Sequence, residues 1–95
     1  MTTIKDLMLY EEVLLRIEKR YNTNEIKLPF DLLISLKQEL KKLASYTDIY
    51  LEEVKRIEGF DDEEERLSKM ENTTVLYDST NYLKIINSEE VASFF

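Results

Sequence analysis

The chain has 95 residues, a formal net charge of -7 and 43% hydrophobic residues, a composition that favours one compact domain with a modest core. It contains no cysteine and no histidine, which excludes a disulfide framework and removes the usual general base, the thiolate nucleophile and the commonest transition-metal ligands. Its single glycine excludes a glycine-rich phosphate loop. We therefore expect a protein that is not an enzyme and that uses no cofactor or metal.

The negative charge is concentrated in the last third of the sequence. Residues 1–60 carry ten Lys and Arg against eleven Asp and Glu, whereas residues 61–95 carry three against nine. Phosphate binding needs clustered Lys and Arg, so we expect no direct nucleic-acid binding. No run of eighteen apolar residues and no basic-then-apolar start is present, so we expect neither a membrane span nor a secretory signal.

The first predicted element is a helix over residues 4–21. Thr3 can cap this helix, with Asp6 three residues later as a weaker form of the capping box. Apolar side chains then recur at spacings of three and four residues, at Leu7, Tyr10, Leu14, Ile17 and Tyr21. The turn cluster of residues 22–24, Asn-Thr-Asn, ends the helix because asparagine tolerates the left-handed conformation.

A longer helix is predicted over residues 30–58. Pro29 suits the start of a helix, and Gly59 suits the position just past its end. Apolar residues follow a heptad pattern with one polar exception, at Leu33, Leu36, Leu40, Leu43, Thr47, Tyr50, Val54 and Ile57. The short connection allows the two helices to pack as a long antiparallel helical hairpin of the coiled-coil type, which occupies residues 1–60 of a single domain.

The acidic subregion, residues 61–95, is predicted to begin with a short third helix in which Leu67 and Met70 make the apolar contacts. The β-favouring runs 73–77 and 82–86 flank a four-residue turn signal, which predicts a small C-terminal β-hairpin or extended segment. A helix through the same residues is the alternative. Ser88 can cap a last helical turn. The fold class is therefore mainly α.

The two long helices differ in length, which predicts a partner-binding surface. At about 1.5 Å per residue they span roughly 27 and 43 Å, so the last turns of the second helix outrun the first. Such apolar surface needs cover from the C-terminal third, a second copy or another protein, and we favour the C-terminal third. Aromatic and apolar residues near this end form the predicted partner-binding set: Tyr46, Tyr50, Val54, Ile57, Phe94 and Phe95.

Two charged clusters are weighed as alternative sites. The acidic run Asp61, Asp62, Glu63, Glu64 and Glu65 can imitate phosphates, although a solvated helix cap is favoured over a metal site because the carboxylates do not converge. The lysines Lys37, Lys41 and Lys42 are candidates for phosphate contact. However, Asp31 and Glu39 are interspersed among them, which predicts an ordinary exposed surface of mixed charge.

The segment Leu28-Pro29-Phe30, followed by the leucine-rich helix to Glu58 and preceded by the helix from Leu7, resembles a family of small helical proteins of unknown role encoded by tailed bacteriophages. The resemblance covers residues 5–67 and brings no catalytic residues. It implies a phage origin, with the host cytoplasm or the virion as location. We therefore expect a non-catalytic accessory or assembly adaptor that binds another protein or itself; the alternative is an acidic inhibitor of a host defence or nucleic-acid-binding protein.

Overall fold

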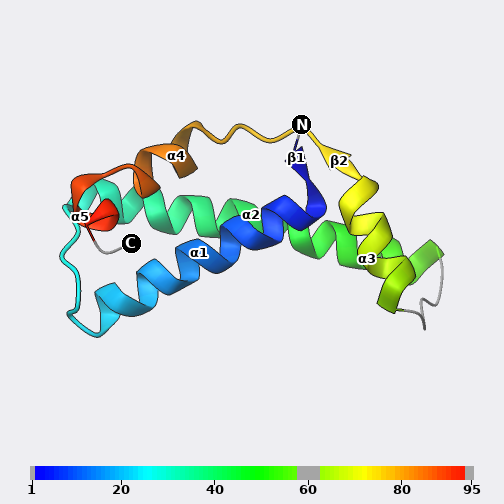
Figure 1. Cartoon of the computed structure of the whole chain (residues 1–95), viewed down its shortest axis with the longest axis horizontal. Helices are drawn as coiled ribbons and strands as arrows, with labels where there is room; N and C mark the ends of the chain where they lie inside the picture. The colour runs from blue at the N-terminus through cyan, green and yellow to red at the C-terminus, as the bar shows by residue number, and fades with distance from the viewer. Residues whose placement is uncertain (1, 58–62, 94–95) are drawn as a thin grey trace.

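The computed structural model describes the backbone of residues 2–57 and 63–93, and the side chains of these residues except at 51, 53–57, 63 and 65–67. The chain is mainly helical, with one small antiparallel sheet of two strands. Two long helices, α1 (Ile4–Asn22) and α2 (Phe30–Ile57), pack against each other and cross the molecule in opposite directions (Figure 1). None of the described helices combines the length and the apolar character that crossing a membrane requires.

Helix α1 begins and ends through local hydrogen bonds that the sequence predicts. The Asp6 amide donates to Thr3 Oγ1 at 3.2 Å, and the Thr3 amide donates to Asp6 Oδ2 at 3.0 Å, so the predicted capping box is present. At the other end, Asn24 adopts a positive φ of 62° in the turn that follows the helix. The apolar stripe faces inward, with Leu7, Leu14 and Ile17 buried.

Helix α2 spans the whole molecule. Its 28 residues extend about 42 Å at about 1.5 Å per residue, which matches the longest dimension of 43 Å. Pro29 lies directly before the helix, and its carbonyl accepts a hydrogen bond of 2.9 Å from the Leu33 amide. The predicted end at Glu58 and Gly59 lies outside the described residues. Among the side chains of α2 that the structure describes, the buried ones are Leu32, Ser35, Leu36, Glu39, Leu43 and Tyr50.

The small sheet brings the N-terminal residues 2–3 beside residues 74–75. Strand β1 (Thr2–Thr3) pairs antiparallel with β2 (Thr74–Val75), with Thr2 opposite Val75 and Thr3 opposite Thr74. Between α2 and β2 lies α3 (Glu63–Asn72), the predicted third helix, in which Met70 is buried. The Ile4 amide donates to the Thr73 carbonyl at 3.1 Å. The start of α1 is therefore held against the end of α3.

The predicted β-hairpin within residues 73–86 is wrong, whereas the alternative, a helix, is confirmed for residues 80–86. Residues 80–86 form helix α4 (Thr80–Ile86), and the strand at 74–75 pairs with the N-terminal strand instead. The Asp78 carboxylate accepts bonds of 3.0 Å from the Thr80 amide and 2.6 Å from the Thr80 hydroxyl, which starts the helical turn. Tyr82 and Ile85, three residues apart, are buried together. Burial on one helical face thus outweighs the β-propensity of these side chains.

The chain described after α4 forms one further turn, α5 (Glu89–Ala92), as the sequence predicts. Ser88 occupies the position before it, but its hydroxyl donates to the Ile85 carbonyl at 2.7 Å and accepts no capping hydrogen bond from the amides of the new helix. Val91 is fully buried in the core. The predicted contacts of Phe94 and Phe95 lie outside the described residues.

The C-terminal helices cover a different part of α2 from the one expected. Helix α4 packs on the half of α2 where that helix begins, whereas α3 lies near its other end (Figure 1). The expectation that the C-terminal third covers the far end of α2 is therefore wrong for α4. Tyr50, near that end, is nevertheless only 7% exposed in the single chain. The chain's own residues therefore bury this side chain.

Candidate functional site

Four tyrosines from separate parts of the sequence form a connected set of ring contacts. Tyr10 comes from α1, Tyr46 from α2, Tyr82 from α4, and Tyr77 from the connection before α4. The Tyr10 ring lies 4.4 Å from the Tyr82 ring and 6.0 Å from the Tyr77 ring, measured between centroids. The Tyr46 ring meets the Tyr77 ring edge-on at 6.2 Å. These spacings are typical of favourable aromatic contacts.

A carboxylate is buried beside these rings. Glu39 is 2% exposed, and its Oε1 accepts a hydrogen bond of 2.5 Å from the Tyr77 hydroxyl. The interpretation of Glu39 as part of an exposed surface of mixed charge is therefore wrong, because its face of α2 packs inward. Burial, followed by the hydrogen bond to Glu39, raises the pKa of the Tyr77 phenol above its ordinary value. Burial, followed by the neighbouring Tyr10, also raises the pKa of Tyr82.

The connection before α4 also contacts two side chains of α2, Lys42 and Tyr46. The Lys42 ammonium lies 5.0 Å from the centroid of the Tyr77 ring, a cation–π distance. The Tyr46 hydroxyl donates to the Leu76 carbonyl at 3.3 Å. Asp78 follows, and the hydroxyl of Thr80, followed by its amide, lowers the pKa of the Asp78 carboxyl. We call residues 76–78 the connector; it links the buried Glu39 to the exposed side of α2.

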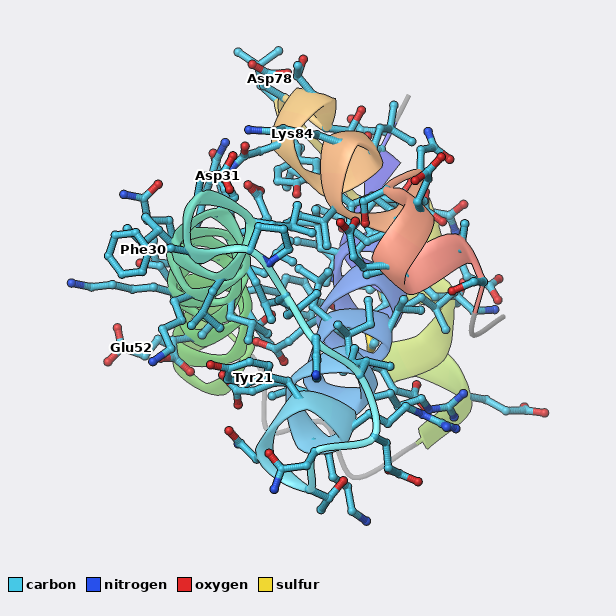
Figure 2. All side chains as sticks on the ribbon, turned by 90° about the vertical axis from the view of Figure 1, so that its left-hand side faces the viewer. Tyr21, Phe30, Asp31, Glu52, Asp78 and Lys84 are labelled. Atoms are coloured by element: carbon cyan, nitrogen blue, oxygen red, sulfur yellow. The ribbon has the colours of Figure 1, made fainter. Side chains whose placement is uncertain are left out.

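A hollow of about 480 Å³ lies on the outer side of α2. The described residues that line it all belong to this helix: Gln38, Lys41, Lys42, Ser45, Tyr46 and Ile49. Ile49 is 62% exposed there. Phe30 and Glu52, which fall on the same helical face, project away from the rest of the molecule (Figure 2). The hollow therefore occupies a face that α1 leaves free.

A second hollow, of about 370 Å³, lies at the end of α1 and is more polar. Its described lining consists of Arg16, Lys19, Arg20 and Glu25. Arg16 is paired with Glu12 at 2.7 Å, the predicted pair along one helical face. Arg16 is thus already paired, and the hollow offers less apolar surface than the one on α2. The hollow on α2 is the stronger candidate.

Of the six predicted partner-binding residues, the structure describes the side chains of Tyr46 and Tyr50. Tyr46 lines the hollow on α2, whereas Tyr50 lies in the core. Val54 and Ile57 belong to the last turns of α2, but their side chains, like Phe94 and Phe95, lie outside the described part of the chain. The prediction misses Lys41, Ser45 and Ile49. Their spacing of four residues places them on one helical face, and this spacing could have identified them from the sequence.

The acidic run is only partly described. Asp61 and Asp62 lie outside the described residues; Glu63, Glu64 and Glu65 lie in the first turn of α3, and of their side chains only Glu64 is described, as exposed. Among the side chains that the structure describes, no group of three or more acidic residues is placed to hold a metal ion. The interpretation of this run as a phosphate imitation therefore depends on the sequence alone.

Comparison with protein-family models, with curated proteins and with solved structures gives no match for this chain. The resemblance to small bacteriophage proteins thus stays a prediction from the residues that suggested it. The function has to be argued from the surface chemistry of this molecule, in which the hollow on α2 is the larger and more apolar of the two hollows described above.

Proposed function

We propose that this chain is a non-catalytic protein-interaction module and that the outer face of α2 is its binding surface. The observation that carries the proposal is the hollow of about 480 Å³, in which the exposed Ile49 and the half-buried Tyr46 offer apolar and aromatic contact. Partner-binding surfaces are typically centred on such anchors and rimmed by polar side chains. The absence of histidine and cysteine from the sequence supports a role without catalysis.

In this proposal α1 and α2 act as an antiparallel helical hairpin that supports the binding face. Fully buried leucines of both helices, Leu14 of α1 with Leu36 and Leu43 of α2, support this role, because close-packed side chains hold a helix in a fixed position. The connector adds a second constraint, since it contacts both Lys42 and Tyr46. A surface held in this way loses less conformational entropy when a partner binds.

The resemblance to small bacteriophage proteins extends the proposal to an accessory or assembly role in which the partner is a larger protein. The alternative, an acidic inhibitor of a host protein, finds no specific support in the described residues, since of the five side chains in its acidic run only that of Glu64 is described. We therefore carry the adaptor forward as the proposed function.

The proposal is tested by site-specific photo-cross-linking of the full chain in a lysate of cells that produce it naturally. A photoreactive amino acid replaces Ser45, which lines the hollow, or Glu12, which is exposed on α1. We expect one protein to be cross-linked from position 45 and not from position 12. Excess unlabelled chain should compete with this cross-link, whereas excess chain carrying Ile49→Asp should not, because a charge at the exposed anchor opposes apolar contact.

Circular dichroism of each variant provides the control, because both substituted positions are exposed and the fold should be retained. Equal cross-linking from positions 45 and 12, or no cross-link from position 45, would contradict the proposed function.

A further inference from the structure

The outer face of α2 carries charges of opposite sign on the two sides of its midpoint. Lys37 and Lys41 lie one helical turn apart in the first half of the helix, and both are exposed. Asp48 and Glu52 lie one turn apart in the second half and are also exposed; Glu52 projects away from the rest of the molecule (Figure 2). Among the described residues, none of these four side chains makes an ion pair. Each charge has a like charge one turn away, an arrangement that destabilises a helix.

The opposite charges on this face are too far apart to pair within one helix. Lys41 and Asp48 are separated by two helical turns, about 10 Å along the axis. Asp48 instead has a further carboxylate nearby on α1, since burial, followed by the charge of Asp48, raises the pKa of Glu11. Each half of the face therefore presents the charges that the other half needs.

We propose that this face binds the same face of a second copy of the chain, with the two α2 helices antiparallel. The assignment rests on the proposed function, because it identifies the partner that the outer face of α2 binds. In a two-fold contact, if position i of one copy meets position j of the other, then j also meets i. A two-fold axis between Ala44 and Ser45 brings position 41 opposite position 48 and position 37 opposite position 52.

Both pairs of opposite charge form in this one register. Lys41 meets the partner's Asp48, and Lys37 meets the partner's Glu52, and the two-fold axis repeats both contacts. Parallel helices in equal register would instead place each of these residues beside its own copy, with like charges in contact. Charge complementarity thus selects the antiparallel arrangement as well as the partner.

The centre of the proposed contact allows the two helices to approach closely. Ala44 and Ser45 lie beside the axis, and both have small side chains. Ser45 and Lys41 also line the hollow on α2, so the second copy covers part of it. The aliphatic stems of the lysines and the exposed Ile49 at the rim supply the apolar contact.

The other charges near this face do not oppose the register. The ammonium of Lys42 is held at the flank, 5.0 Å from the centroid of the Tyr77 ring. Lys55 and Arg56 follow in α2, and the register places their positions opposite the uncharged residues 33–34. The net charge of -7 repels a second copy over long distances, but salt screens this repulsion beyond about 10 Å at 0.1 M. Exposed ion pairs are individually weak, so the dimer should dissociate on dilution.

Complementary charge reversals test the pairing. Sedimentation equilibrium of the full chain should show a monomer–dimer equilibrium as concentration rises. The double variant Lys37→Glu/Lys41→Glu should associate at least about tenfold more weakly, because it brings like charges together, and so should Asp48→Lys/Glu52→Lys. An equal mixture of the two variants should dimerise like the parent, because every pair is again of opposite sign.

Net charge alone cannot produce that result. The two double variants shift the net charge by equal amounts in opposite directions, so the mixed dimer has the total charge of the parent dimer. The matched variant Lys27→Glu/Lys84→Glu lowers the net charge as much as the α2 lysine variant does, at exposed positions outside α2. It should dimerise nearly as well as the parent. Equal weakening by both lysine variants would show a general charge effect and would overturn the assignment.

A single introduced cysteine tests the register, since the chain has no cysteine of its own. Ser45→Cys places the thiols of the two copies beside the axis. Gln38→Cys places them about 20 Å apart along the helices, because position 38 lies opposite position 51. Oxidation should link copies of the first variant and not of the second, since a disulfide needs Cα atoms within about 7 Å. Equal linking of both variants would overturn the antiparallel register. Circular dichroism checks that both exposed substitutions retain the fold.

Two outcomes separate this assignment from the proposed function. If the assignment is correct, the photo-cross-link from position 45 joins two copies of the chain. A chain that stays monomeric at every concentration, with a different protein cross-linked from position 45, would overturn the assignment and leave α2 as a binding face. A monomeric chain without any cross-link from position 45 would overturn both proposals.

Discussion

The Glu39 carboxylate lies inside a helical core with the Tyr77 hydroxyl as its hydrogen-bond donor. Burial of a charged group is costly unless hydrogen bonds replace the lost contacts with water. Thirty-eight residues separate the two partners in the sequence, so their bond ties the connector to the middle of α2. A polar pair of this kind specifies how two segments meet, because a shifted packing would leave the carboxylate without its donor.

Removal of this donor should destabilise the fold. We expect Tyr77→Phe to lower the free energy of unfolding by about 1–3 kcal/mol, the usual cost of a buried polar group that loses its hydrogen bond. The ring and its contacts with Tyr10 and Tyr46 remain in this variant, so the change isolates the hydroxyl. Urea denaturation followed by circular dichroism measures the difference.

The double variant Glu39→Leu/Tyr77→Phe supplies the control, because removal of both partners leaves no buried group unsatisfied. It should lose less stability than the two single variants added together. Additive losses would show that Glu39 and Tyr77 act independently, contrary to the observed contact.

Tyrosine burial predicts that the fold weakens in alkali. Burial raises the pKa of Tyr77 and Tyr82 in the folded chain, so the unfolded chain releases their protons first as pH rises past about 10. Their contribution to stability is complete below that pH and declines above it. The melting temperature should therefore fall between about pH 9.5 and 11, and Tyr77→Phe should make the fall shallower. A pH slope that is the same in parent and variant would contradict the assignment.

At the scale of single elements, α2 has one face that needs apolar side chains for packing and another face that tolerates charged ones. Leu36 is fully buried against the rest of the core, whereas Ile49 lies on the outer face. Leu36→Asp should abolish the cooperative thermal transition, since a buried unpaired carboxylate costs several kcal/mol. The free energy of unfolding of Ile49→Asp should lie within about 0.5 kcal/mol of that of the parent, as is usual for substitutions at exposed positions. The opposite order of effects in thermal melts would mean that the faces are assigned incorrectly.

The long helices were predictable because their signals repeat over many residues. Thr3 with Asp6 marks the start of α1, residues 22–24 mark its end, and heptad spacing runs through α2. Helix α4 was harder to predict, because its short apolar run fits a strand as well as a helix. The helix is favoured because it buries Tyr82 and Ile85 on one face, and this burial depends on the rest of the fold. Local pattern says little about such brief segments.

The candidate site was predictable only in part, for a related reason. Tyr46 was identified as an aromatic residue suited to interfaces. Ile49 and Lys41 are candidates only because they lie on the side of α2 that no other segment covers, which the sequence does not show. The buried position of Glu39 depends on Tyr77, a residue of the connector. Spacing along one helix does not reveal which distant segment covers it.

At the scale of the whole molecule, the C-terminal third completes the core. Tyr82, Ile85 and Val91 are all buried, and α4 packs on α2. Deletion of residues 73–95 should therefore lower the melting temperature and expose apolar surface of α2, which produces oligomers or aggregates in light scattering. It also removes the strand that pairs with β1.

Leu76→Ser is the matched control for this deletion. Leu76 belongs to the deleted segment but is 97% exposed, so its substitution should change neither stability nor association. A truncated chain that stays monomeric and as stable as the parent would show that the first two helices need no cover from the C-terminal third.

The pairing of β1 with β2 closes a ring in the polymer sense, because it brings residues 2–3 to residues 74–75. Closing a flexible loop of about 70 residues costs about 3.8 kcal/mol in chain entropy, apart from a constant. The two residue pairs of the sheet, one Thr–Val and one Thr–Thr, contribute too little to offset that cost. The ring must be held shut by the packing of α3 against α1, including the buried Ile4 and Met70. The sheet should therefore form only while α3 packs against α1. The Ile4 amide donates its hydrogen bond to the Thr73 carbonyl, so its hydrogen should exchange with solvent whenever α3 separates from α1.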